Sequence, residues 1–225
     1  MKQYSLSEEN YLKSIFHLEQ KAQGSVSTND IAEKMETKAS SVSDMIRKLS
    51  EKNLVDYVKY QGVTLTSKGR DTALRVIRKH RLWEVFLVEK LDFQWDEVHD
   101  IAEELEHIES EELIARLDAF LGHPKFDPHG DPIPDKNLQL KKIEKYLLSD
   151  LKVGQNAICV GVHESDDDFL KYLDRSKIGI GTKISVEAKE AFDGSMNIVI
   201  DQKSHFISKK IADNIYVQLL ENRKS

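Results

Sequence analysis

The sequence predicts a mainly α-helical protein with small β parts: a winged helix-turn-helix head, a helical middle segment and a small C-terminal β-barrel. The head shows three helical patterns followed by a hairpin pattern. All four prolines of the 225-residue chain lie within residues 122–135, a density that ends regular structure. Beyond this linker, short alternating segments replace the helical periodicity. We therefore expect domains at 1–65, 66–138 and 139–225.

In the head, helical spacing of apolar residues marks residues 5–20, 27–35 and 38–53 as helices. Residues 54–69 alternate on both sides of Gln61-Gly62, as in a hairpin whose glycine can take a positive φ. In a winged helix-turn-helix, the third helix enters the major groove of DNA. Small hydroxyls at its start can reach phosphates and base edges, although serines there can also be ordinary helix caps. The expected DNA-binding residues are Lys38, Ser40, Ser41, Ser43, Arg47 and Lys48.

The third segment is expected to be a small barrel of short strands with one helix. The patterns "QNAICVGV", "KISVEAK", "MNIVID" and "NIYVQLL" are typical of strands, and "DDDFLKYLDRS" of a helix. The one cysteine, Cys159, excludes an internal disulfide and fits a reducing compartment, and its apolar neighbours place it in a core. No stretch reads as a signal peptide or a membrane span, so a cytoplasmic location is expected.

Charge is unevenly distributed along the chain. Residues 1–80 contain 14 Lys and Arg against 10 Asp and Glu, a balance of +4, whereas the remainder has 19 against 29, a balance of −10. A mildly basic head on an acidic body is compatible with nucleic-acid binding by the head.

The stretch "VHDIAEELEHIES", residues 98–110, concentrates potential metal ligands on one face of a predicted helix. At about 100° per residue, one stripe holds His99, Glu103, Glu106 and His107, and the opposite stripe is apolar. A solvated charged face is the alternative interpretation. Upstream, His80 and Glu84 are one helical turn apart, so both could face one ion.

In this order, these features resemble the diphtheria-toxin-repressor family of metal-dependent transcriptional repressors, almost from end to end. The resemblance rests on the winged head, "RKHRLWE", "VHDIAEELEH", the "GDPIP" linker and a barrel similar to that family's SH3-like (FeoA-like) domain. It implies a homodimer, formed through residues 66–138, that binds double-stranded operator DNA and controls metal-uptake genes when metal is plentiful. It implies neither a membrane partner nor a small organic substrate.

The resemblance also implies two metal sites per subunit. One would use His80, Glu84 and His99, with Glu164 and Asp168 added from the barrel. The other would use Glu103, Glu106 and His107 with Asn10, where relatives carry aspartate or methionine. Lys13 stands where the manganese branch without a barrel has a glutamate, which argues against the paired-ion geometry of that branch.

The residue at position 103 bears on which metal is bound. In the family, iron-type members carry cysteine there and manganese-type members a carboxylate. Carboxylate oxygens suit Mn²⁺, whereas a thiolate favours softer, later ions. Glu103 therefore predicts Mn(II), with Fe(II) as the alternative. Three further histidines, in the linker and the barrel, are expected at the surface: His123, His129 and His163.

Two functions of other classes compete with a repressor. Glu104-x-x-His107 fits half of a carboxylate-bridged metalloenzyme, but no second such motif accompanies it in a bundle-like context. A winged-helix regulator could instead use its acidic face only to bind a partner protein. Metal-dependent operator binding would separate these possibilities.

Overall fold

The computed structural model describes residues 4–58, 61–140, 144–163 and 166–220. The chain forms two compact units, one of Met1–Trp83, Ala102–Phe120 and Pro134–Leu140, the other of Glu84–Ile101, Leu121–Ile133 and Lys141–Ser225. The boundary between the units falls inside two continuous helices.

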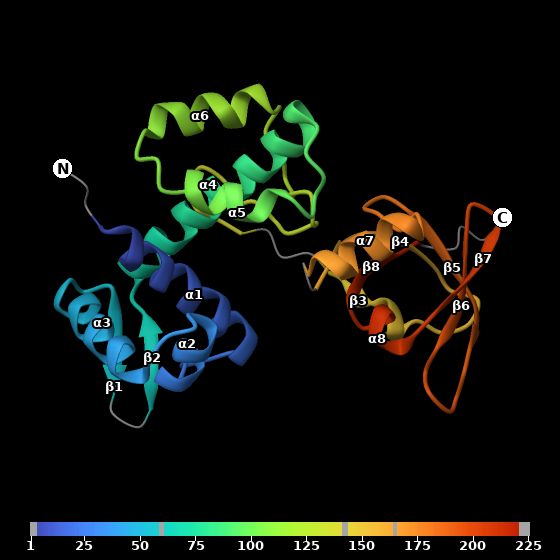
Figure 1. Cartoon of the computed structure of the whole chain (residues 1–225), viewed down its shortest axis with the longest axis horizontal. Coiled ribbons are helices and arrows are strands. Elements are labelled where there is room, and N and C mark those ends of the chain that lie inside the picture. The colour runs from blue at the N-terminus through green and yellow to red at the C-terminus, as the bar shows by residue number, and fades with distance from the viewer. Residues whose placement is uncertain (1–3, 59–60, 141–143, 164–165, 221–225) are drawn as a thin grey trace. The chain divides into compact units, whose positions relative to one another are not determined.

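The head is a winged helix-turn-helix, as predicted (Figure 1). Ser5 and Ser27 each form a capping box, and these boxes fix where the first two helices begin. The two wing strands pair antiparallel, with Val58 opposite Gly62 at the turn. The elements are α1 (Leu6–Ala22), α2 (Thr28–Lys34), α3 (Ala39–Glu51), β1 (Val55–Val58) and β2 (Gly62–Leu65).

Apolar side chains from the head helices and the wing form one core, which includes the fully buried Leu12, Ile31 and Leu49. The amphipathic stripe of α3 lies on this core, so the opposite face of α3 is exposed. The hydrophobic pattern therefore fixes which side chains of α3 can reach a ligand.

Three helices form the middle segment: α4 (Ser67–Leu91), α5 (Val98–Leu105) and α6 (Glu111–Phe120). The prediction that the helix at 98 continues to about 110 is wrong, because α5 ends at Leu105. Glu106 still donates its backbone N–H to Ala102, but the chain then turns, and Ser110 accepts a hydrogen bond from the Leu113 N–H at the start of α6.

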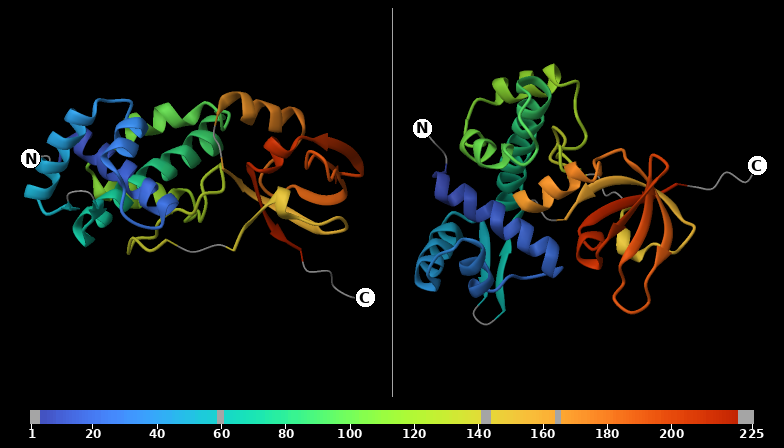
Figure 2. Two further views of the ribbon diagram at one scale, coloured as in Figure 1. Left: turned by 90° about the horizontal axis from the view of Figure 1, so that it is seen from below. Right: turned by 45° about the vertical axis from the view of Figure 1, so that its right-hand side comes forward.

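The C-terminal domain is a six-stranded antiparallel sheet of order β3-β8-β4-β5-β6-β7. Its strands form a strongly curved sheet (Figure 2). The apolar core of this domain contains Cys159. Cys159 is a buried core residue, as predicted, and burial raises the pKa of its thiol to about 11. The elements are β3 (Tyr146–Leu147), η1 (Leu148–Asp150), β4 (Asn156–Val162), α7 (Asp167–Arg175), β5 (Lys183–Lys189), β6 (Met196–Ile200), β7 (Lys203–Ile207), α8 (Lys209–Ala212) and β8 (Ile215–Leu219). Among the described residues, no helix is long and apolar enough to cross a membrane.

Candidate metal centre

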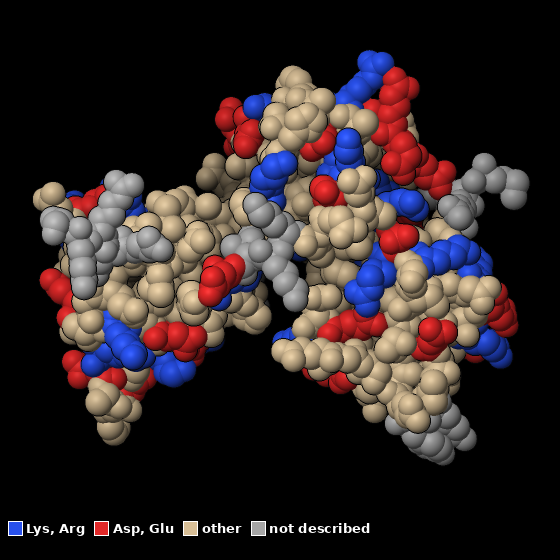
Figure 3. Space-filling view, turned by 180° about the vertical axis from the view of Figure 1, so that it is seen from behind, with Lys and Arg blue, Asp and Glu red and all other residues tan. Residues whose placement is uncertain are grey.

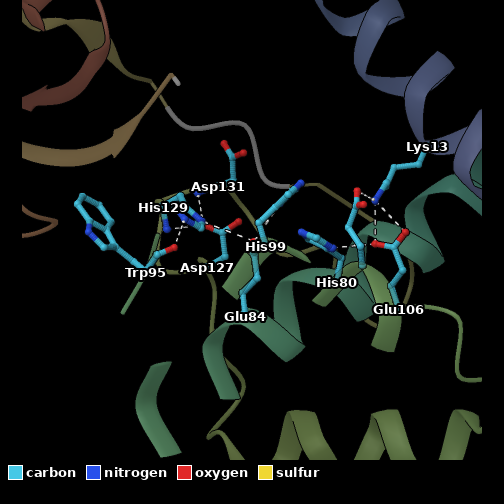
Figure 4. A network of polar contacts seen from close by, with 10 residues as sticks. Lys13, His80, Glu84, Trp95, His99, Glu106, Asp127, His129 and Asp131 are labelled. Atoms are coloured by element: carbon cyan, nitrogen blue, oxygen red, sulfur yellow. Dashed lines mark hydrogen bonds and ion pairs between the residues drawn. The ribbon is translucent and has the colours of Figure 1, made fainter. Parts of the chain in front are cut away.

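Helix α4 places two of the predicted ligands, His80 and Glu84, one turn apart on the same side. Both are buried, although charged side chains are seldom buried without a partner. His99 is the second residue of α5, and its Nδ1 lies 3.7 Å from Oε1 of Glu84. Ligand atoms of these three residues all lie within 4.8 Å of one another (Figure 4). The three ligands predicted for the first site from the helices are thus brought together.

Glu84 also belongs to a second group of potential ligands, with Asp127 and His129. Nδ1 of His129 lies 3.7 Å from Oε1 of Glu84 and 4.0 Å from Oδ1 of Asp127. All three residues are buried. The prediction that His129 lies at the surface is therefore wrong, and Asp127 was not predicted at all.

The Asp127 side chain shapes the turn that carries His129. Its Oδ1 accepts hydrogen bonds from the backbone N–H groups of His129, at 2.8 Å, and of Asp131, at 2.9 Å. Such an Asx-type turn satisfies the backbone locally, so this proline-rich segment can be buried without a strand or helix. The signal in the sequence was Asp-x-His next to a glycine in "DPHGDP".

The acidic groups around His129 determine the pKa of its imidazole. Burial by itself lowers the pKa of His129, but Glu84, Asp127 and the carbonyl of Trp95 together outweigh burial and raise the pKa to about 9. The imidazolium is thus the dominant form at neutral pH. A divalent cation has to displace this proton in order to use His129 as a ligand.

The carboxylates predicted for the second site surround a lysine. Nζ of Lys13, on α1, lies 3.0 Å from Oε1 of Glu103 and 2.8 and 2.9 Å from the two oxygens of Glu106 (Figure 4). The Glu106 side chain is fully buried, whereas that of Glu103 is 46% exposed. The ammonium group of Lys13 therefore supplies positive charge where the resemblance implies a metal ion.

His107, the third predicted ligand of this site, contacts α1 as well. Its Nδ1 lies 2.6 Å from Oε2 of Glu9, a buried carboxylate that was not predicted as a ligand. Asn10 is partly buried, and within the described part of the chain its Oδ1 has no hydrogen-bond partner. A buried carbonyl oxygen without a partner is costly, and a cation would satisfy it. Oxygen and nitrogen donors from α1 and from residues 103–107 therefore suit a divalent cation.

The ligands expected from the barrel have less support. Glu164 lies outside the described residues. Asp168 is exposed in the first turn of α7, where its backbone N–H bonds to the Asp166 side chain. His123 and His163 are exposed, as expected, and His163 contacts the hydroxyl of Tyr216 at 2.9 Å.

The predicted DNA-binding side chains all lie on the exposed side of α3 or at its start: Lys38, Ser40, Ser41, Ser43, Arg47 and Lys48. Lys38 is the N-cap residue and no side chain caps α3, so the serines do not serve as caps. The Ser43 hydroxyl instead bonds back to the Ala39 carbonyl. Basic and acidic side chains are interspersed over the face of the molecule seen in Figure 3.

Three segments of the chain match known family models. Residues 4–63 match the N-terminal DNA-binding domain of the iron-dependent repressors, 66–135 their metal-binding and dimerisation domain, and 146–219 the FeoA domain. A solved manganese-dependent transcriptional repressor in complex with manganese is 38% identical, with a TM-score of 0.85 over 95% of this chain and 100% of that chain. The chain belongs to the iron-dependent repressor family.

This is the diphtheria-toxin-repressor family that the sequence resembles, and it consists of transcriptional repressors, not enzymes. The iron-dependent repressor IdeR of Mycobacterium leprae is 36% identical over 126 residues, which are 56% of this chain and 54% of that protein. The match thus spans about half the length of that relative. A probable metal transport system membrane protein of Chlamydia trachomatis is 44% identical over 88 residues, which are 39% of this chain and 19% of that protein.

Proposed function

We propose that this repressor is activated by Mn(II), binds operator DNA as a homodimer in the cytoplasm and controls metal-uptake genes. The observation that carries the choice of metal is the absence of sulfur among the potential ligands in the described part of the chain. The only cysteine of the chain, Cys159, is buried in the core of the C-terminal domain. Carboxylate, amide and imidazole donors remain, and such sets suit Mn²⁺ better than sulfur ligands do.

Two ligand sets support the first site. His80, Glu84 and His99 form one set, and Asp127 with His129 adds two donors around the same Glu84 carboxylate. A bound ion would supply the positive charge that offsets these buried carboxylates. Glu84 is the residue common to both sets, so it should matter most for affinity.

The second site would link metal to DNA binding through α1. Donors on both sides of a bound ion could hold α1 in place. They are Glu9 and Asn10 on α1, and Glu103, Glu106 and His107 later in the chain. Fixing α1 would favour one arrangement of the winged heads in the dimer, because ligands shift populations toward the state that they bind best. Two heads must reach major grooves about one helical turn, or a multiple of it, apart.

Fe(II) is the alternative metal, because several relatives matched over 126 residues, that of Mycobacterium leprae among them, are named iron-dependent repressors. An oxygen-rich site binds Fe²⁺ at least as tightly as Mn²⁺, so availability matters as well as ligand type. Control of metal uptake is favoured by the match to part of a probable metal transport protein.

A gel-shift titration of Mn²⁺, Fe²⁺ and Zn²⁺ against the promoter of a metal-uptake gene tests this function. Mn²⁺ should induce a complex between the protein and the promoter. The free Mn²⁺ concentration needed should be lower than the one at which the protein binds unrelated DNA. Equal DNA binding with and without every metal would refute the proposal, and activation by Fe²⁺ alone would assign the alternative metal.

A further inference from the structure

The connection between α4 and α5, residues 92–97, is anchored on helix α7 of the C-terminal domain, within the same compact unit. Trp95 packs against the apolar core of that domain, and its indole Nε1 donates a hydrogen bond to Oδ2 of Asp174 at 3.1 Å. Beside it, Asp96 lies 3.7 Å from Nζ of Lys171. Two polar contacts and an apolar contact therefore hold a connection that is otherwise irregular.

Trp95 also contacts His129 in two ways. Its backbone carbonyl lies 2.9 Å from Nε2 of His129, and the two rings are stacked, with centroids 6.1 Å apart and planes 9° from parallel (Figure 4). A carbonyl can only accept a hydrogen bond, so Nε2 must carry a hydrogen. The ring nitrogen that can offer a lone pair to a cation is then Nδ1, which faces Glu84 and Asp127.

The backbone of His129 is held by strand β4 of the same domain. Val162 donates its N–H to the His129 carbonyl at 3.0 Å. Gly130 packs so closely on β4 that a Cβ at this position would lie 2.0 Å from the Val160 carbonyl oxygen. Backbone and ring of His129 are thus fixed by separate contacts, and only the ring contacts pass through Trp95.

We propose that Trp95 is a positioning residue for metal binding: anchored by Asp174, it orients the His129 ring so that Nδ1 faces the ion. The C-terminal domain would then influence metal affinity through the indole–carboxylate contact. This inference rests on the proposed function, in which His129 is a metal ligand. Hydrogen bonds to the second nitrogen of a ligating histidine commonly contribute 10- to 100-fold to metal affinity.

The test measures Mn²⁺ affinity of the full-length protein by electron paramagnetic resonance of the unbound ion, together with the thermal midpoint of the metal-free protein. Asp174→Ala removes the acceptor, and Trp95→Phe removes the donor while keeping a ring and the carbonyl. Each removes the hydrogen bond that supports the Trp95–His129 contact and should weaken Mn²⁺ binding by about three- to tenfold. Asp174→Asn keeps an acceptor oxygen and should stay within about twofold of wild type. Glu190→Ala, which changes an exposed acid of the same domain, is the control.

A positioning role predicts two further results. The double variant Trp95→Phe/Asp174→Ala should be no weaker than either single variant, because both remove the same contact. The thermal midpoint of the metal-free protein should change little in these variants, because the contact matters more for metal affinity than for folding. Wild-type affinity in both single variants, or losses that add in the double variant, would overturn the inference. A wild-type protein that binds no Mn²⁺ or Fe²⁺ would refute the proposed function instead.

Discussion

Nδ1 of His80 lies 2.7 Å from Oε2 of Glu106, so a ligand predicted for one metal site contacts a ligand predicted for the other. Glu106 is completely buried and also contacts Lys13. The two sites therefore share a polar network that runs from α1 through Glu106 to α4 (Figure 4). A change at one site should be felt at the other.

Glu106→Ala should lower the free energy of unfolding of the metal-free protein by about 3 kcal/mol, because it leaves the mostly buried Lys13 ammonium without its main partner. Urea denaturation measures this. Adding Lys13→Met to Glu106→Ala should recover part of the loss, since the uncompensated charge is removed. A Glu106→Ala protein as stable as wild type would show that this buried pair contributes no net stability.

Lys13→Met should raise the affinity of the Glu9, Glu103, Glu106 and His107 cluster for Mn²⁺ by about tenfold, because a tethered cation no longer competes with the ion. After dialysis at limiting free Mn²⁺, the variant should retain more Mn²⁺ per subunit than the wild-type protein. Lys21→Met, which changes a basic residue in the last turn of the same helix, serves as the matched control. Unchanged metal content would mean that Lys13 does not occupy a metal position.

The stability of the metal-free protein should fall as pH rises from about 6.5 to about 9. The pKa of His129 is raised in the folded state to about 9, from 6.5. Its contribution is thus complete below pH 6.5 and is lost as pH rises through about 9, up to about 3 kcal/mol. His129→Gln should flatten this part of the profile. A wild-type slope in the variant would assign the pH dependence to other groups.

Glu103→Cys should shift the preference for activating metal from Mn²⁺ toward later, softer ions, because a thiolate replaces a hard oxygen donor. Operator-binding titrations with Mn²⁺, Fe²⁺, Co²⁺ and Zn²⁺ measure this order. Glu104→Cys places a thiol on the neighbouring residue, which is also exposed, and should not change it. The same metal order in both variants would argue against Glu103 as a ligand.

Local patterns predicted most of the fold, because helix caps, the Gln61-Gly62 turn and the alternating strands are encoded in neighbouring residues. Helix geometry also placed His80 and Glu84 one turn apart, whereas His99 was joined to them only through the resemblance to the family. Asp127 and His129 were missed because prolines normally mark exposed loops. Their burial depends on Gly130 packing on β4, a contact between residues about 30 positions apart that no local pattern reports.

The second site shows the same limit. The periodicity of apolar residues predicted a helix to about 110, whereas the turn after Leu105 depends on how Ser110 starts α6. The resemblance had already marked Lys13 as a basic residue at a position where one branch of the family has a glutamate. Its three contacts required the packing of α1 against residues 103–107, about 90 positions away.

We propose that metal binding holds α1 against residues 103–107 and thereby activates operator binding. Hydrogen exchange of α1 with increasing Mn²⁺ tests it most directly, with operator binding measured in the same samples and His107→Ala as the comparison. We expect the amides of residues 6–22 to become more protected as operator binding rises. We expect His107→Ala to lose both effects while its metal-free head stays folded. Operator binding that rises with Mn²⁺ while α1 exchange stays constant would contradict it.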